Sequence, residues 1–165
     1  MPPWRYLVAL GSNVRHARHG PPERVLRAAL AASEREGMEV RLVSPIIRTE
    51  PIGPSLRRYA NGAALVSSEL DPREMLAGLK RIERAFGRRP GGQRWRARVL
   101  DLDIVLWSGG CWASSELTIP HPLFRQRRFV LGPASAIAPD WRDPVTGLTL
   151  RQLFARLTRP RPLLR

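Results

Sequence analysis

The sequence predicts an α+β fold, a ferredoxin-like sandwich of the order β-α-β-β-α-β with a C-terminal extension of short helices. Three observations support this prediction. Four apolar runs have the length of strands, and segments with helical spacing of their apolar residues follow the first run and the third. The chain has 165 residues, of which 43% are hydrophobic and 25% are charged. That size and composition are typical of one globular domain, here residues 1–165.

The first half of the chain supplies two strands and one helix to this pattern. Residues 4–10 are apolar and partly aromatic, and the sequence Gly-Ser-Asn at 11–13 closes them, so they predict a strand and a loop. A helix is predicted to begin at residues 21–23, because proline suits the first helical turn, and to end at Gly37. Residues 40–47 are β-branched and apolar, which predicts the second strand.

The second half supplies two further strands and a helix between them. Residues 59–70 alternate and predict the third strand. Asp71 is a good helix N-cap, proline follows it, and Glu74 stands where it can reach back to the cap, so a helix is predicted from here to Gly87. Residues 99–107 predict the fourth strand.

Residues 108–165 are rich in proline and form the predicted extension. Short helices are expected at 131–137 and 149–157, and residues 159–165 resemble a loose basic tail. No apolar run reaches the ~18 residues of a membrane span, and the N-terminus lacks the pattern of a signal peptide. Cys111 is the only cysteine, which excludes an internal disulfide and a cysteine-based metal cluster. We therefore expect a cytoplasmic protein without a membrane partner.

The net charge is +14, and arginine supplies almost all of the positive charge, since Lys80 is the only lysine. One explanation is an anionic partner such as a nucleotide phosphate or RNA. The other is a general replacement of lysine by arginine, with no functional meaning. Composition alone leaves both explanations open.

Two carboxylates stand in the fourth predicted strand. Because side chains alternate along a strand, Asp101 and Asp103 share one face, roughly 6.5 Å apart along the backbone. The apolar residues predicted to share the other face, under the helices, are Leu100, Leu102, Ile104 and Leu106. Carboxylates in an apolar strand must be neutralised, either by arginine or by a divalent cation such as Mg²⁺. The spacing does not decide between these two.

A segment with five arginines, residues 87–98, directly precedes the two aspartates. Arginine grips phosphate with two parallel hydrogen bonds, and together with Mg²⁺ it can stabilise the charge of a transferring phosphoryl group. The alternative is a solvated surface loop, but the neighbouring carboxylates favour phosphoryl transfer.

Further candidate residues follow the same chemistry. His121 is flanked by prolines that fix its position, and several arginines follow it closely. Tyr59 and Phe129 are candidates for stacking on a flat heterocycle, and Asn61 shares the strand face of Tyr59 and can bond the edge of such a ring. Without these neighbours, the aromatic residues would be ordinary core residues and the histidine a structural one.

Taken in order, these segments resemble the 6-hydroxymethyl-7,8-dihydropterin pyrophosphokinases of folate biosynthesis, and the resemblance runs from about residue 7 to about residue 155. The motifs that carry it are Leu10-Gly11-Ser12-Asn13, Arg48-Thr49-Glu50-Pro51-Ile52-Gly53-Pro54, Tyr59-Ala60-Asn61, Arg81-Ile82-Glu83, Arg94-Trp95, Arg98-Val99-Leu100-Asp101-Leu102-Asp103, Ile119-Pro120-His121-Pro122 and Arg127-Arg128-Phe129-Val130-Leu131.

The resemblance implies the transfer of the β,γ-pyrophosphate of ATP to the hydroxymethyl group of the pterin, with release of AMP. Two Mg²⁺ ions would sit on Asp101 and Asp103. Arg88 and Arg98 would contact the transferring phosphates. The residues implied for the pterin are Thr49, Ile52, Tyr59, Asn61 and Phe129. The residues implied for ATP are Glu83, Trp95, Arg98, Ile104, His121 and Arg127.

Two other functions are weighed against this one. A basic RNA-binding module has the same order of strands and helices, but such modules display aromatic residues where this chain has two carboxylates. A catalytically silent homologue would still bind pterin or ATP, and the intact aspartate pair argues against it. We expect ATP and the pterin as partners, no nucleic acid, and a monomer or a dimer.

Overall fold

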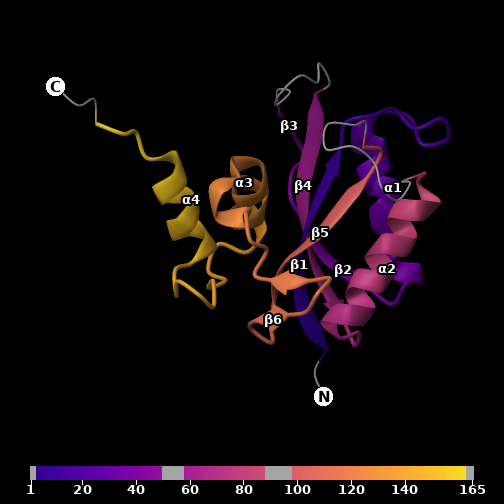
Figure 1. Cartoon of the computed structure of the whole chain (residues 1–165). Coiled ribbons are helices and arrows are strands. Elements are labelled where there is room, and N and C mark those ends of the chain that lie inside the picture. The colour runs from indigo at the N-terminus through magenta and orange to yellow at the C-terminus, as the bar shows by residue number, and fades with distance from the viewer. Residues whose placement is uncertain (1–2, 50–57, 88–97, 163–165) are drawn as a thin grey trace.

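The computed structural model describes residues 3–49, 58–87 and 98–162. In this part of the chain, an antiparallel sheet is combined with four α-helices (Figure 1). The elements in chain order are β1 (Trp4–Ser12), α1 (Pro22–Arg35), β2 (Glu39–Val43), β3 (Ile47–Thr49), β4 (Tyr59–Ser68), α2 (Pro72–Ala85), β5 (Asp101–Trp107), β6 (Trp112–Ala113), β7 (Thr118–Ile119), the 3₁₀ turn η1 (Phe124–Gln126), α3 (Arg128–Ile137) and α4 (Leu150–Thr158).

The strands of the main sheet lie in the order β2-β4-β1-β5, and β3 pairs with β4 beyond the end of β2. Each of these pairs is antiparallel. The long central strands β1 and β4 are paired along their whole length, from Trp4 opposite Ser68 to Ser12 opposite Ala60. The ends of β1, β3, β4 and β5 therefore meet at one end of the sheet, where Gly11 lies between Asn61 and Asp101.

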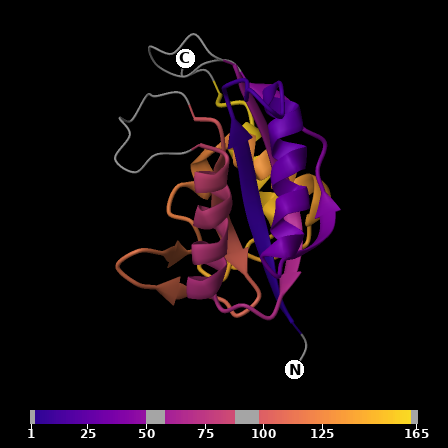
Figure 2. The ribbon, with the colours of Figure 1, turned by 90° about the vertical axis from the view of Figure 1, so that its right-hand side faces the viewer.

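The helices cover both faces of the sheet. Figure 1 shows α1 and α2 on one side and α3 and α4 on the other, and Figure 2 shows α1 and α2 side by side. The core under α1 and α2 includes Tyr6, Val8 and Leu10 of β1, and the core under α3 and α4 includes Leu7. This alternation along β1 is what a strand buried on both faces requires.

The predicted start of α2 is confirmed. Asp71 caps the helix, since its carboxylate accepts from the N–H of Glu74 at 2.9 Å, and the Glu74 carboxylate accepts from the N–H of Asp71 at 2.8 Å. Gly87 ends the helix with φ +97°, a conformation that costs other residues steric strain. The capping box thus fixes where α2 begins.

The prediction of one strand over residues 40–47 is wrong in its continuity. The structure has two short strands here, β2 and β3, which both pair with β4. Pro45 between them has no N–H for a ladder. Ser44 fills the gap, because its N–H donates to the carbonyl of Ala63 and its Oγ accepts from the N–H of Ala63, both at 2.9 Å.

The prediction that Leu106 shares a face with Leu102 and Ile104 is also wrong. Leu7 pairs with Leu106 while Val8 pairs with Ile104, so Val105 is the extra residue of a β-bulge. Leu106 accordingly packs in the core under α3 and α4, whereas Leu102 and Ile104 pack under α2. Alternation fails here because a bulge resets the register by one residue.

Two helices of the extension lie close to their predicted positions, as α3 and α4. The β6–β7 hairpin and η1 were not predicted, because their strands of two residues and turn of three carry too little pattern. The hairpin lies beside α2 (Figure 2). In the described part of the chain, every helix is too short or too polar to cross a bilayer.

Candidate active site

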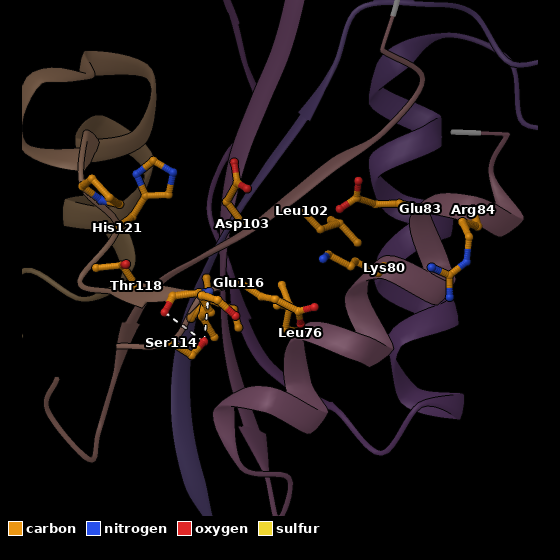
Figure 3. A pocket seen from close by; sticks show the side chains of 14 residues that line it. Leu76, Lys80, Glu83, Arg84, Leu102, Asp103, Ser114, Glu116, Thr118 and His121 are labelled. Carbon is orange, nitrogen blue, oxygen red and sulfur yellow. Dashed lines mark hydrogen bonds between the residues drawn. The ribbon is translucent and has the colours of Figure 1, made fainter. Parts of the chain in front are cut away.

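Two cavities open on either side of Asp103, which lines both of them. The first, of about 650 Å³, lies between α2, β5 and the β6–β7 hairpin, and we call it the α2 cavity (Figure 3). The second, of about 520 Å³, lies where β1, β3, β4 and β5 end against the start of α3, and we call it the sheet-end cavity. Both volumes are in the range of small-molecule sites.

The two aspartates lie as the alternation predicts, since both line the sheet-end cavity. Asp103 is exposed, while the side chain of Asp101 is only 18% exposed and accepts from Arg98 Nη1 at 3.1 Å. The charge of Asp101 raises the pKa of Arg98, with a smaller contribution from Asp103. Arg98 therefore stays charged at the border of the cavity, beside both carboxylates.

Asn13 holds the main chain at Arg98. Its side-chain Oδ1 accepts from the N–H of Arg98 at 2.6 Å, and its own N–H donates to the carbonyl of Arg98 at 3.0 Å. The segment after β1 thus fixes the residue that leads into β5. From the sequence, Asn13 is expected only in the loop after the first strand and in one of the family motifs, because a bond to a residue 85 positions away leaves no local signal.

His121 lines the α2 cavity with a defined tautomer. Its Nδ1 accepts from the N–H of Leu123 at 3.1 Å, so the ring proton of the neutral form is on Nε2. Burial lowers the pKa of His121, and the charge of Arg127 lowers it further, against an opposing effect of Asp103. The imidazole is therefore a neutral Nε2–H donor near neutral pH.

The sheet-end cavity brings together the predicted stacking and edge-binding residues, Tyr59, Asn61 and Phe129, with Thr49 beside them. Asn61 is 5% exposed, and its Nδ2 donates to the hydroxyl of Thr49 at 2.9 Å, which leaves its Oδ1 oriented toward Gly11. A β-carbon at Gly11 would lie 3.4 Å from that Oδ1. Glycine here keeps the amide oxygen accessible.

The α2 cavity contains Glu83, Ile104 and His121, as predicted for one binding site. Glu83 is 6% exposed despite its charge. Two further side chains that the sequence analysis missed, Lys80 and Glu116, extend into the same cavity (Figure 3). Their spacing offers no signal, because α2 and the hairpin meet only in the folded chain.

Arg98 and Arg127 were expected with the ATP residues, and the structure places both at the sheet-end cavity. The guanidinium carbon of Arg127 lies 5.7 Å from the centre of the Phe129 ring, so its charge faces the aromatic surface. Ile52, Arg88 and Trp95, which were also expected at the site, lie outside the described residues.

A family model described as "7,8-dihydro-6-hydroxymethylpterin-pyrophosphokinase (HPPK)" matches residues 7–139 of this chain. The chain belongs to this family. The match confirms the resemblance and, with it, the prediction of an ATP-dependent pyrophosphokinase of folate biosynthesis.

Curated relatives with the corresponding name match this chain over most of their length. The 2-amino-4-hydroxy-6-hydroxymethyldihydropteridine pyrophosphokinase of Pseudomonas aeruginosa is 40% identical over 154 residues, which cover 92% of this chain and 90% of the relative. The enzyme of that name from Synechocystis is 36% identical over 151 residues, or 92% and 75% of the two chains.

Solved structures of HPPK-DHPS proteins share the fold of this pyrophosphokinase. A Plasmodium falciparum HPPK-DHPS triple mutant with SDX-DHP superposes over 93% of this chain with a TM-score of 0.72 at 15% identity. An HPPK-DHPS in complex with substrates superposes over 94% with a TM-score of 0.73 at 12% identity. This chain spans less than half the length of these neighbours, 44% and 43%, and at such identities the likeness is one of fold.

Proposed function

We propose that the α2 cavity binds ATP, that the sheet-end cavity binds 6-hydroxymethyl-7,8-dihydropterin, and that the pyrophosphoryl group passes between them beside Asp101 and Asp103. The observation that carries this assignment is the position of Asp103, which lines both cavities. A transfer between two substrates needs their reacting atoms within about 3.5 Å, so the border between two sites is the place for it.

In the proposed pterin site, aromatic side chains stack on the ring and one amide binds its edge. Tyr59 and Phe129 line the sheet-end cavity and offer aromatic faces to the ring. The Oδ1 of Asn61 accepts from the donors on the edge of the pterin, because the Thr49 hydroxyl fixes the orientation of the amide. Backbone groups near Thr49 and Ile52 complete this proposed site.

The proposed ATP site is the α2 cavity. Ile104 offers an apolar surface to the base, while Glu83 and the neutral His121 contribute one acceptor and one Nε2–H donor. We retain Trp95 as an ATP-binding residue. Arg127 lies on the pterin side of Asp103, where its charge suits the phosphates as they approach the border.

Asp101 and Asp103 fit a Mg²⁺ site. They lie on one face of β5, and the described residues contain no group of three or more histidine, cysteine or acidic side chains that could form a complete protein site. Mg²⁺ suits such a site, since it is commonly bound by one or two carboxylates together with phosphates and water. When bound, the proposed two ions neutralise charge on the triphosphate.

The chain's own groups then align and stabilise the transfer. The hydroxymethyl oxygen attacks the β-phosphorus and its hydroxyl proton is released to solvent. The bond from the β-phosphorus to the bridging oxygen of the α-phosphate breaks, and AMP leaves with that oxygen and its electron pair. Arg98, held by Asn13 through its main chain, presents its charge to the transferring group, and Arg88 is proposed to do the same. A closed site excludes water, which otherwise competes as the acceptor.

We also propose that the main sheet is a ferredoxin-like sheet. The antiparallel order β2-β4-β1-β5, with one helix between β1 and β2 and another between β4 and β5, supports this topology.

Cross-binding of two variants tests the assignment of the cavities. Asn61→Ala is expected to weaken pterin binding about ten-fold and to leave Mg–ATP binding unchanged, since a buried edge contact is lost. Glu83→Ala is expected to have the opposite selectivity. Calorimetric titration of each variant with each substrate measures both. Equal weakening of both substrates in either variant would contradict the assignment.

A further inference from the structure

An ion pair between Arg125, whose side chain is 26% exposed, and the fully buried Asp143 joins the segment between the two cavities to the connection between α3 and α4. Asp143 is fully buried, and its carboxylate accepts from Arg125 through two hydrogen bonds, Nε at 2.6 Å and Nη2 at 2.8 Å. The same carboxylate accepts from the Thr146 hydroxyl at 2.7 Å and from the N–H of Val145 at 3.1 Å. The carboxylate is therefore fixed in orientation as well as neutralised.

Arg125 is the middle residue of η1, and the residues on both sides of it belong to the site. His121 lines the α2 cavity, while Gln126, Arg127 and Phe129 line the sheet-end cavity. Arg125 itself turns away from both cavities toward Asp143. One side chain thus anchors a short segment whose neighbours reach both substrates.

Both ends of the ion pair are packed or hydrogen-bonded to their surroundings. Phe124, the first residue of η1, is fully buried, and the guanidinium carbon of Arg125 lies 4.6 Å from the centre of its ring. On the other side, Asp143 closes a turn, because its carbonyl accepts from the N–H of Gly147 at 2.8 Å and its N–H donates to the carbonyl of Leu148 at 2.9 Å. The ion pair connects two ordered pieces of chain that are 18 residues apart.

A second ion pair in the same region provides a contrast. Arg151 and Asp140 are 3.6 Å apart, and their side chains are 69% and 85% exposed. Such a pair contributes little, because water screens it. Burial of an ion pair, which is complete for Asp143 and partial for Arg125, costs desolvation of the ions, and apolar residues of similar volume are often equally stabilising. The stability of the fold therefore does not by itself require Arg125 and Asp143. Their two parallel hydrogen bonds, however, fix the orientation of η1 relative to the turn at Asp143.

We propose that Arg125 and Asp143 are positioning residues of the pyrophosphokinase, which hold η1 so that Phe129 faces the pterin and Arg127 faces the border between the cavities. This inference rests on the proposed pterin site. It assigns a function to two residues that line neither cavity and for which no substrate contact is proposed.

The test separates position from stability with four variants. Arg125→Met leaves Asp143 without its arginine, and the double variant Arg125→Met/Asp143→Asn removes both charges. The amide oxygen can still accept from the N–H of Val145, and the amide NH2 can donate to the Thr146 hydroxyl in place of the bond that this hydroxyl donates to the carboxylate. Arg125→Lys retains the charge without the paired geometry. Arg151→Ala, which breaks the exposed pair, is the matched control. For each, thermal unfolding and the KM and kcat for both substrates are measured at a temperature where all variants are folded.

We expect the double variant to regain most of the melting temperature that Arg125→Met loses, yet to retain a pterin KM about ten-fold above that of the wild type, with a smaller change in kcat. The pterin KM of Arg125→Lys should lie between those of the wild type and the double variant. Arg151→Ala should match the wild type in pterin KM. A wild-type pterin KM in the double variant would overturn the proposal. So would a pterin KM that follows the melting temperature through the whole series, because the pair would then be structural only.

Phe129→Ala in the same assay distinguishes the positioning role from the pterin site. A raised pterin KM in Phe129→Ala, together with normal values in the Arg125 and Asp143 variants, overturns the positioning role and leaves the proposed function intact. A normal pterin KM in Phe129→Ala would overturn the pterin site on which the positioning role depends.

Discussion

Replacement of Phe129 by alanine is the substitution whose effect follows most directly from the sheet-end cavity. Phe129 lines that cavity together with Tyr59 and does not line the α2 cavity. Its ring offers one aromatic face to the pterin, and Arg127 lies 5.7 Å from the ring centre. Loss of the ring therefore removes stacking from one side of the pterin and the support of the arginine beside it.

The magnitude follows from the value of one stacked face. Base–aromatic stacking is worth about 1–3 kcal/mol by alanine substitution, so we take about 2 kcal/mol here. Since about 1.4 kcal/mol corresponds to a factor of ten, Phe129→Ala should weaken pterin binding about thirty-fold. ATP binding should change less than about two-fold, because no ATP contact is proposed for this residue.

Fluorescence titration of the pterin and calorimetry of Mg–ATP measure the two affinities. Phe154→Ala is the matched control, since Phe154 packs in the core under α3 and α4 and lines neither cavity. The control should lower stability and leave pterin affinity unchanged. If Phe129→Ala binds pterin as tightly as the wild type, the ring does not stack on the substrate and the sheet-end cavity is wrongly assigned.

Three further predictions concern the charged groups. Asp103→Ala should lower kcat by about 100-fold or more with an unchanged circular dichroism spectrum, and normal turnover would refute the proposed metal site. Arg98→Ala should lower kcat far more than it weakens pterin binding, and an unchanged kcat in steady-state assays would remove Arg98 from the catalytic residues. Burial alone would raise the pKa of Asp143, but the hydrogen bonds from Arg125, Thr146 and Val145 outweigh it and lower the pKa below the ordinary value. The stability that this carboxylate contributes is therefore present at neutral pH and lost as the pH falls below about 4. The difference in melting temperature between wild type and Asp143→Asn should accordingly shrink from pH 7 to pH 3, and a constant difference would show that the carboxylate is not paired in solution.

Local sequence pattern was sufficient to predict the start of α2 and the shared face of the two aspartates, both of which determine the site. The start of α2 could be predicted because Asp71 and Glu74 satisfy each other's main-chain N–H groups within one turn. The shared face of Asp101 and Asp103 followed from alternation, which holds at that end of β5. It fails at Val105, the extra residue of the bulge, because a bulge depends on the pairing with the neighbouring strand and not only on the strand's own sequence.

Contacts between distant segments could not be predicted in the same way. The sequence contains many arginines, so nothing in it shows that Arg125 pairs with Asp143 and Arg98 with Asp101. The division of the site into two cavities has the same origin, since α2 and the β6–β7 hairpin form a wall only after folding. The motifs shared with the family indicated which residues belong to the site. Only the three-dimensional structure shows that His121 and Arg127 line different cavities.

The central claim is pyrophosphoryl transfer from ATP to the pterin beside the aspartate pair. The most direct test incubates the protein and its Asp101→Ala variant with ATP, Mg²⁺ and 6-hydroxymethyl-7,8-dihydropterin, and separates the nucleotides by chromatography. We predict pterin-dependent AMP with the wild type and none with the variant. ADP as the product, or equal AMP from the variant, would contradict the account.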